Sequence, residues 1–297
     1  MHADEAEIDA DLVRRLIAAQ FPRWAGLPVE RVRSGGAVNA VFRLGDELSV
    51  RLPLTAAGAQ DVDLEYGQLP RLAAAVPVPV PEPLAKGEPG AGYPYPWSVC
   101  RWLDGTTPPP DAGVAAPGPL AGELAAFVAA VRAVDPAGAP PSYRSETLAD
   151  RDAGTRDALA RLRPEDGVDV PAATAAWETA LRAPAHTGPP VWLHGDLSPG
   201  NVLVIDRGHL GGVLDFGCMG LGEPAVDLIA GWNLFTGPAR AAFRAALADC
   251  GVDDAAWARG RGWALSISLI QLPYYRHTNP FLVASSKFVI DEVLAER

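Results

Sequence analysis

The stretch VWLHGDLSPGNVLV (Val191–Val204) places three polar side chains, His194, Asp196 and Asn201, between two apolar runs that predict β-strands. A Ser-Pro-Gly turn alone is sufficient to join two strands. Such a turn requires neither a carboxylate nor a carboxamide at a fixed separation around it. The pattern therefore indicates a functional site and not a simple connection.

A second polar motif begins fourteen residues after Asn201. Residues 211–215 predict another short strand, and Asp215-Phe216-Gly217 comes at its end. Two strands joined by a tight turn would bring Asp196, Asn201 and Asp215 to the same end of a hairpin. Any one of these residues is explained by capping of a turn, but six specified residues in order, H-x-D-x-x-x-x-N and then D-F-G, are not.

Phosphoryl transfer is the chemistry that uses one free carboxylate, one amide oxygen and a second carboxylate in one place. Asn201 and Asp215 are predicted to hold Mg²⁺ on the phosphates of a nucleotide, because hard cations prefer oxygen ligands. Asp196 is predicted to orient the attacking hydroxyl and to accept its proton.

Composition excludes several classes of partner. The 297 residues are 48% apolar and 21% charged, with a net charge of −11, so no basic stripe is available for nucleic acid. An acidic chain is compatible with a cationic ligand. The N-terminal residues resemble no signal peptide, and no apolar run approaches a membrane span. Three cysteines without C-x-x-C spacing predict a reduced, cytoplasmic chain.

Strand patterns precede helical patterns along the chain. Strands are predicted within 29–54 and at 95–105, a helix at 8–20, a second at 61–76 that Pro70 interrupts, and an extended, proline-rich connector at 76–84. Further helices are predicted at 120–134, 147–162, 172–183, 237–249, 254–273 and 283–296, around the short strands at 191–206 and 211–215. This order is typical of an α+β fold with a boundary near residue 104.

The segments LHGDLSPGNVLV and GVLDFGCMGLGEPAVDLI resemble the aminoglycoside phosphotransferase family, the antibiotic kinases, including macrolide phosphotransferases, that share the protein-kinase-like fold. The G-x-G-E-P-A-x-D-L continuation, which contains Asp227, is similar to that family and unlike ordinary protein kinases. The resemblance covers roughly residues 25–235. It implies a small β-rich nucleotide-binding lobe at 1–103 and a larger helical lobe at 104–297 that carries the catalytic loop and the acceptor site.

The resemblance also assigns roles in the small lobe. Ser34, Gly35 and Gly36 would form the loop over the phosphates, although the G-x-G-x-x-G pattern is absent. Arg51 stands where protein kinases have a phosphate-pairing lysine, with Glu65 as its helix partner within about 4 Å. The nucleotide base would lie near Cys100 and Trp102. His194 is expected to be structural, and Asp227 to cap the catalytic-loop backbone.

The expected function is Mg²⁺-dependent transfer of the γ-phosphoryl group of ATP or GTP to a hydroxyl of a small molecule, such as an aminoglycoside or macrolide. Asp291 and Glu292, with Glu296, form an acidic group on the terminal helix that is expected to meet amino groups of the acceptor.

A metabolic kinase for a choline, homoserine or sugar-amine acceptor would use the same catalytic residues. A protein kinase is disfavoured because no A-P-E segment follows Gly217. A non-catalytic nucleotide-binding module would be expected to lack one of Asp196, Asn201 and Asp215. Whether the chain is a monomer or a homodimer is left open.

Overall fold

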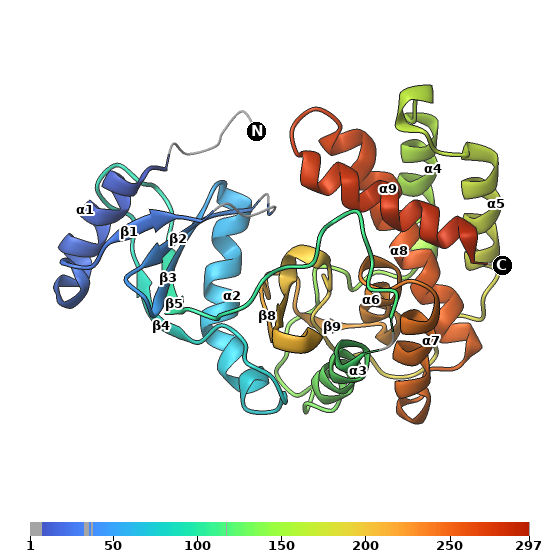
Figure 1. The fold of residues 1–297 in the computed structure, drawn as a ribbon, viewed down its shortest axis with the longest axis horizontal. Coiled ribbons are helices and arrows are strands. Elements are labelled where there is room, and N and C mark those ends of the chain that lie inside the picture. The colour runs from blue at the N-terminus through green and yellow to red at the C-terminus, as the bar shows by residue number, and fades with distance from the viewer. Residues whose placement is uncertain (1–7, 33–35, 37, 117, 297) are drawn as a thin grey trace.

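The chain forms two lobes that lie side by side, a sheet-containing lobe and a mainly helical lobe (Figure 1). The computed structural model describes residues 8–32, 36, 38–116 and 118–296. The predicted order of strands followed by helices is confirmed, and with it the two-lobed α+β architecture.

The small lobe is built on an antiparallel sheet in the order β1-β2-β3-β5-β4. Its elements in the described residues are α1 (Ala10–Gln20), β1 (Val29–Arg31), β2 (Asn39–Leu44), β3 (Leu48–Pro53), α2 (Ala56–Ala73), β4 (Pro83–Gly87) and β5 (Trp97–Arg101). Asp9 caps α1 by accepting a hydrogen bond from Leu12 N at 2.7 Å. Helix α2 continues through Pro70 as far as Ala73, so the predicted interruption is absent there.

The two faces of this sheet differ in chemistry because side chains alternate along each strand. Phe42, Val50 and Val99 are fully buried on one face, in a core that also contains the apolar side chains of α1. Arg51 and Ser98 belong to the other face, where α2 lies. The polar face of the sheet is therefore turned toward the rest of the molecule.

One strand of this sheet was not predicted. Residues 76–84 were expected to form only an extended connector, but β4 begins within them, at Pro83, and pairs with β5. β4 lies at the edge of the sheet, where proline is tolerated because one side of the strand needs no donor.

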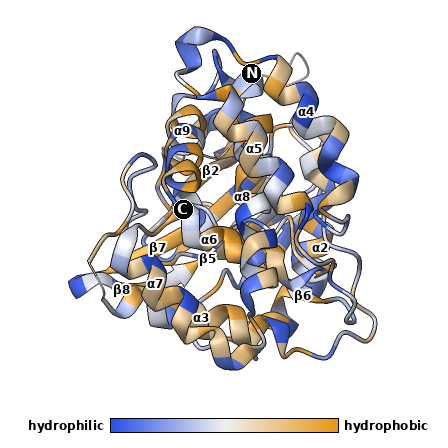
Figure 2. Cartoon of the chain, turned by 90° about the vertical axis from the view of Figure 1, so that its right-hand side faces the viewer, coloured by the Kyte–Doolittle hydropathy of each residue, from blue (hydrophilic) through white to orange (hydrophobic). Residues whose placement is uncertain are grey.

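The helical lobe contains the remaining strands and α-helices of the described residues. They are α3 (Pro119–Arg132), α4 (Asp152–Ala160), α5 (Val170–Leu181), β6 (Val191–Leu193), β7 (Val202–Ile205), β8 (His209–Val213), β9 (Gly220–Gly222), α6 (Ala230–Asn233), α7 (Gly237–Ala246), α8 (Asp254–Tyr275) and α9 (Pro280–Ala295). Helix α3 is mostly hydrophobic in colour in Figure 2, in keeping with its seven buried side chains. No helix in the described ranges is both long and apolar enough to cross a membrane.

The short strands of the helical lobe form two pairs. The predicted hairpin is present as β7 and β8, with Asn201 just before β7 and Asp215 just after β8. The two apolar runs on either side of the His194–Asn201 loop form separate strands, β6 and β7, as predicted, but β6 pairs with β9, which was not predicted. β6 and β9 are far apart in sequence, so no local signal links them.

The described residues form two hydrophobic cores. The border between them departs from the predicted lobe boundary at α2. The small-lobe core comprises the sheet and α1. Leu69 and Leu72 of α2, both fully buried, belong to the other core together with α3, α8 and α9. Helix α2 thus precedes the predicted boundary in sequence and lies against β3, β4 and β5, but its C-terminal part contributes to the core of the helical lobe.

Candidate active site

A buried carboxylate, that of Asp227, binds the backbone of the loop that follows β6. Asp227 is fully buried, and its two oxygens accept hydrogen bonds from His194 N at 2.9 Å and Gly195 N at 2.8 Å. This is the capping role predicted for Asp227. The imidazole of His194 is also buried, with Nδ1 accepting from Asp196 N at 3.1 Å and Nε2 lying 2.9 Å from Leu214 O. His194 therefore joins the loop to the residue that follows β8, as its predicted structural role requires.

Gly195 has a backbone conformation that favours glycine. Its φ is +85°, and a Cβ built there would lie 2.7 Å from Cys218 O. The close approach brings the loop directly against the residues that follow Asp215.

Asp196, Asn201 and Asp215 are brought together. Asn201 Nδ2 donates to both Asp196 O and Asp196 Oδ2, at 2.9 Å and 3.0 Å. Leu214 N donates to Asn201 O at 2.7 Å, which places Asp215 beside Asn201. Asp215 has φ of +58°, a left-handed conformation that is uncommon for a non-glycine residue and recurs at functional sites.

The small lobe contributes the ion pair predicted between Arg51 and Glu65. Arg51 Nη1 lies 2.6 Å from Glu65 Oε2, and Nη2 lies 3.3 Å from Asp215 Oδ1. The other carboxylate oxygen of Glu65 accepts from Phe216 N at 2.9 Å. One guanidinium and one carboxylate thus join the sheet, α2 and the Asp215-Phe216 backbone.

Asp61 is a further carboxylate at this position that the sequence did not single out. It lies one helical turn before Glu65, and a Cβ on Gly217 would meet its Oδ2 at 2.9 Å. Burial, together with Glu65 and Asp215, raises the pKa of Asp61 to about 7. Sequence offered only the four-residue spacing from Glu65, which places both side chains on one helix face.

These side chains fit a hard cation. Three carboxylates, those of Asp61, Glu65 and Asp215, surround the single guanidinium of Arg51, so the cluster carries excess negative charge when its members are ionised. The amide nitrogen of Asn201 is engaged with Asp196, and in the described part of the chain its Oδ1 has no hydrogen-bond partner. One or two protein oxygens with water and phosphate oxygens are a usual environment for Mg²⁺.

The residues predicted to lie near the nucleotide base are placed on the polar side of the sheet. Cys100 is buried beside Arg51, and burial raises its pKa to about 11. Trp102 is only half-buried, and the Arg43 guanidinium lies 4.8 Å from its ring centroid. Its backbone N donates to Glu47 O at 2.7 Å, so this amide is occupied within the lobe.

The predicted phosphate loop falls mostly outside the described residues. Ser34 and Gly35 are not described, whereas Gly36 is described and exposed. In sequence, these three residues connect β1 to β2. Strand β2 pairs with β3, which carries Arg51.

The acidic group on the terminal helix is not brought to this site. Phe281, at the start of α9, packs against Gly200 of the catalytic loop, whereas Glu292 and Glu296 lie near the other end of the helix. Glu292 and Glu296 both pair with Arg240, and Glu296 also accepts from two tryptophan N–H groups. Asp291 is exposed on the same part of α9. Glu292 therefore serves the internal packing of α9.

Arg144 is a second residue that the sequence reasoning missed. Its side chain is 9% exposed, and Nη2 lies 2.9 Å from Asp196 Oδ1. No motif marks it, because it lies 52 residues before Asp196 in an irregular segment.

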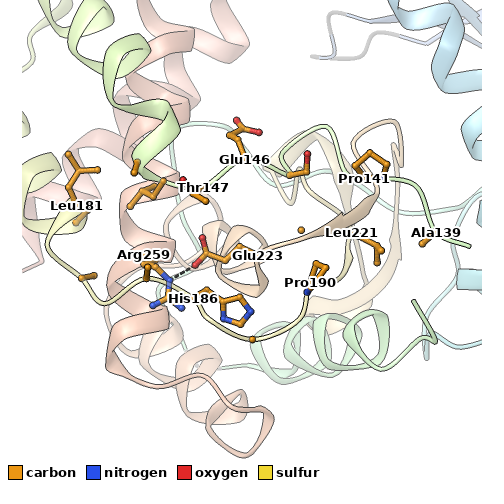
Figure 3. Close-up of a pocket in the computed structure, with 18 residues that line it drawn as sticks. Ala139, Pro141, Glu146, Thr147, Leu181, His186, Pro190, Leu221, Glu223 and Arg259 are labelled. Carbon is orange, nitrogen blue, oxygen red and sulfur yellow. Dashed lines mark hydrogen bonds and ion pairs between the residues drawn. The ribbon is translucent and has the colours of Figure 1, made fainter. Parts of the chain in front are cut away.

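The same segment also borders a cavity of about 580 Å³, shown in Figure 3. The cavity is lined mainly by apolar side chains of residues 139–149, the end of α5 and β9. Arg259 and Glu223, both from the helical lobe, line the cavity and form an ion pair there. Asp196, Asn201 and Asp215 are not among the lining residues, so this cavity is separate from the site described above.

Solved structures with this fold are numerous. The GDP and kanamycin complex of APH(2")-IIia has a TM-score of 0.75 at 21% identity, covering 96% of this chain and 99% of that chain. Macrolide 2'-phosphotransferase type I has a TM-score of 0.65 at 19% identity, covering 95% and 97%. The macrolide 2'-phosphotransferase MphH from Brachybacterium faecium has a TM-score of 0.61 at 21% identity, covering 97% and 98%. At these identities the likeness establishes the kinase-like fold.

Sequence comparison identifies the family. No curated protein sequence matches this chain. The model of the phosphotransferase enzyme family matches residues 29–263, which include β1 to β9 and all the residues that meet around Asp196 and Asp215. The chain therefore belongs to the phosphotransferase enzyme family, and it is a phosphotransferase.

Proposed function

We propose that this phosphotransferase is a Mg²⁺-dependent kinase of small molecules, which transfers the γ-phosphoryl group of ATP or GTP to a hydroxyl of an antibiotic such as an aminoglycoside or a macrolide. The observation that carries the proposal is the convergence of Asp196, Asn201 and Asp215. The Arg51–Glu65 pair, which joins the same place from the other lobe, supports it independently.

Asp196 would act on the acceptor. Its side chain is 30% exposed although both carboxylate oxygens have partners, so the group is accessible to an acceptor from solvent. A positioned carboxylate orients the hydroxyl, whose oxygen forms a bond to the γ-phosphorus as the bond to the β–γ bridging oxygen breaks. The hydroxyl proton passes to Asp196, and the nucleoside diphosphate is released.

Arg51, Asn201 and Asp215 would hold the nucleotide phosphates. Arg51 supplies positive charge, kept in place by Glu65 at 2.6 Å. Asn201 and Asp215 would bind Mg²⁺, which neutralises charge on the phosphates during transfer. The polar face of the sheet near Cys100 and Trp102 would contact the base, and Gly36 with its neighbours Ser34 and Gly35 would cover the phosphates.

Exposed aromatic side chains support a bulky acceptor. Tyr143 and Tyr274 are 75% and 59% exposed. The ring of Tyr143 lies 5.7 Å from the guanidinium carbon of Arg144, which pairs with Asp196, and Tyr274 is in ring contact with Tyr275. Aromatic faces pack against the apolar faces of sugar rings. The solved structures with this fold that carry kanamycin or act on macrolides also support an antibiotic acceptor.

A screen of acceptors tests the proposal. Purified protein with Mg²⁺ and either ATP or GTP is incubated with aminoglycosides, macrolides, tuberactinomycin-type peptides and primary metabolites, and phosphorylated products are identified by mass spectrometry. We expect an antibiotic product that requires Mg²⁺ and is lost in Asp196→Asn.

Two outcomes would favour other functions. Transfer only to a choline, homoserine or sugar-amine acceptor would identify a metabolic kinase that uses the same residues. If the protein binds the nucleotide but neither hydrolyses it nor transfers its phosphate, with or without an acceptor, it is a non-catalytic module.

A further inference from the structure

An irregular segment between α3 and α4 passes directly against the catalytic loop. Ser142 N donates to Leu221 O at 2.9 Å, and Ser142 Oγ donates to Cys218 O at 2.6 Å. A Cβ on Gly220 would lie 2.5 Å from Ser142 N, so the two backbones are in close contact. The segment is thereby fixed to the residues that follow Asp215.

Arg144 extends from this segment to the catalytic loop. Its backbone N donates to Ser142 Oγ at 3.1 Å, which sets the position of its Cα. Its Nε donates to Gly195 O at 2.6 Å, and its Nη2 donates to Asp196 Oδ1 at 2.9 Å. The planar guanidinium therefore holds two successive residues of the loop with a fixed geometry.

The carboxylate of Asp196 is consequently held from two sides. Arg144 binds Oδ1, and Asn201 Nδ2 binds Oδ2 at 3.0 Å. In the described residues Asp196 is the only carboxylate within ion-pair distance of Arg144. The aromatic ring of Tyr143 lies 5.7 Å from the guanidinium carbon.

We propose that Arg144 is a positioning residue for phosphoryl transfer, which acts by fixing the orientation of the Asp196 carboxylate. The inference rests on the proposed role of Asp196 as the base. Holding a reacting group in the productive geometry accounts for a large share of catalysis in phosphoryl transfer, and an error of about 1 Å reduces the rate substantially. A carboxylate held only by Asn201 would rotate about its last two torsions.

Kinetics of single and double variants test the proposal. The readouts are ATP hydrolysis with water as acceptor and transfer to kanamycin, each with kcat and the KM for ATP. For Arg144→Gln we expect kcat to fall by about 10-fold to 10²-fold while the KM for ATP stays within about twofold, because the described contacts of Arg144 include none with Arg51, Asn201 or Asp215. Arg144→Lys should recover part of the loss, since an ammonium retains one charged donor.

The double variant separates positioning from folding. If Arg144 acts through Asp196, then Arg144→Gln should add less than about twofold to the loss in Asp196→Asn. Arg240→Gln is the matched control, because the side chain of Arg240 is also 9% exposed and donates Nε to a carbonyl (Gly231 O) and Nη2 to a carboxylate (Glu292), and among the described residues it shares no hydrogen-bond or ion-pair partner with Asp196. It should lower the melting temperature without changing kcat.

Three results would overturn the inference or its premise. Losses that multiply in the double variant, or a kcat for Arg144→Gln within about twofold of the wild type, would make Arg144 a structural residue only. If Arg144→Gln does not fold, a kcat for Arg144→Lys equal to that of the wild type would have the same meaning. Full activity in Asp196→Asn, or a wild type that is inactive with water, with kanamycin and with every other acceptor of the screen, would instead refute the proposed function.

Discussion

Glu65 binds Arg51 with one carboxylate oxygen and the backbone N–H of Phe216 with the other. A residue of α2 therefore sets the position of both the guanidinium of the sheet and the chain that carries Asp215. Since Glu65 is 5% exposed, neither contact is replaced readily by water. The two sides of the proposed nucleotide site are aligned by this one side chain.

Substitutions of Arg51 should distinguish the contribution of its charge to activity from that of its paired donors. Arg51→Ala should lower kcat/KM for ATP by about 10²-fold or more, because a phosphate partner is removed. Arg51→Lys should recover part of the activity, since the charge remains but the paired donors are lost. Glu65→Gln should have a smaller effect, because an amide oxygen still accepts from Phe216 N. Steady-state kinetics at saturating acceptor measures all three, and activity of Arg51→Ala equal to that of the wild type would exclude Arg51 from the site.

Asp215 should determine the dependence on divalent cations. Asp215→Asn is expected to fold, since its side chain is 37% exposed, yet to lose activity by about 10³-fold, because an amide binds a hard cation more weakly than a carboxylate does. Raising the Mg²⁺ concentration should restore some of the loss. Calorimetric titration of Mg²⁺–nucleotide into both proteins measures the change, and equal affinities with equal turnover would show that Asp215 binds no metal.

Removal of the Asp227 carboxylate, which binds the backbone of the catalytic loop, should lower the stability of the fold. Asp227→Ala leaves two buried N–H groups, on His194 and Gly195, without an acceptor, and should reduce the free energy of unfolding by about 2–4 kcal/mol. Asp291→Ala is the control, because Asp291 is exposed, and it should change the same quantity by less than about 0.5 kcal/mol. Urea denaturation followed by fluorescence distinguishes the two.

Asp61 should give the protein a pH-dependent stability. Its folded-state pKa of about 7 exceeds the ordinary value of 3.8, so between about pH 4 and pH 7 the folded state binds a proton that the unfolded state has lost. The free energy of unfolding therefore falls as the pH rises through this window, and the decrease is complete above pH 7. Asp61→Asn should remove the effect and be more stable than the wild type at pH 8 by about 1–2 kcal/mol, after allowance for solvent screening of this partly exposed group.

The measurement is urea unfolding of both proteins in EDTA at several pH values. The advantage of Asp61→Asn should grow between about pH 4 and pH 7 and then stay constant. A difference that does not vary with pH would show that Asp61 titrates normally.

The sequence predicted those parts of the site that are defined by local spacing. His194, Asp196 and Asn201 occupy one loop, and Asp215 follows the adjacent strand, so a short pattern determines their approach. The Arg51–Glu65 pair was predicted from the family resemblance, and it joins a strand to the helix that follows it directly. These are contacts between neighbouring elements.

The contacts that were missed join distant segments. Arg144 reaches Asp196 from a segment without regular structure, and β9 reaches β6 across the whole β7–β8 hairpin. Such pairings depend on how the lobe packs and not on periodicity or turn residues. The partner of Glu292 was missed for a related reason: acidic residues on a helix do not indicate which cation they meet, and here Glu292 pairs with the internal Arg240.

The packing of α2 has a consequence for exchanging parts between relatives. Leu69 and Leu72 complete the hydrophobic core of the helical lobe, and Arg71 donates to Asp135 O and Ala137 O in that lobe. A chimera joined at residue 103 would therefore replace part of that core along with the sheet. A recombinant that keeps residues 56–80 with the helical lobe, and takes only the strands and α1 from the other parent, preserves both cores and is the one expected to fold.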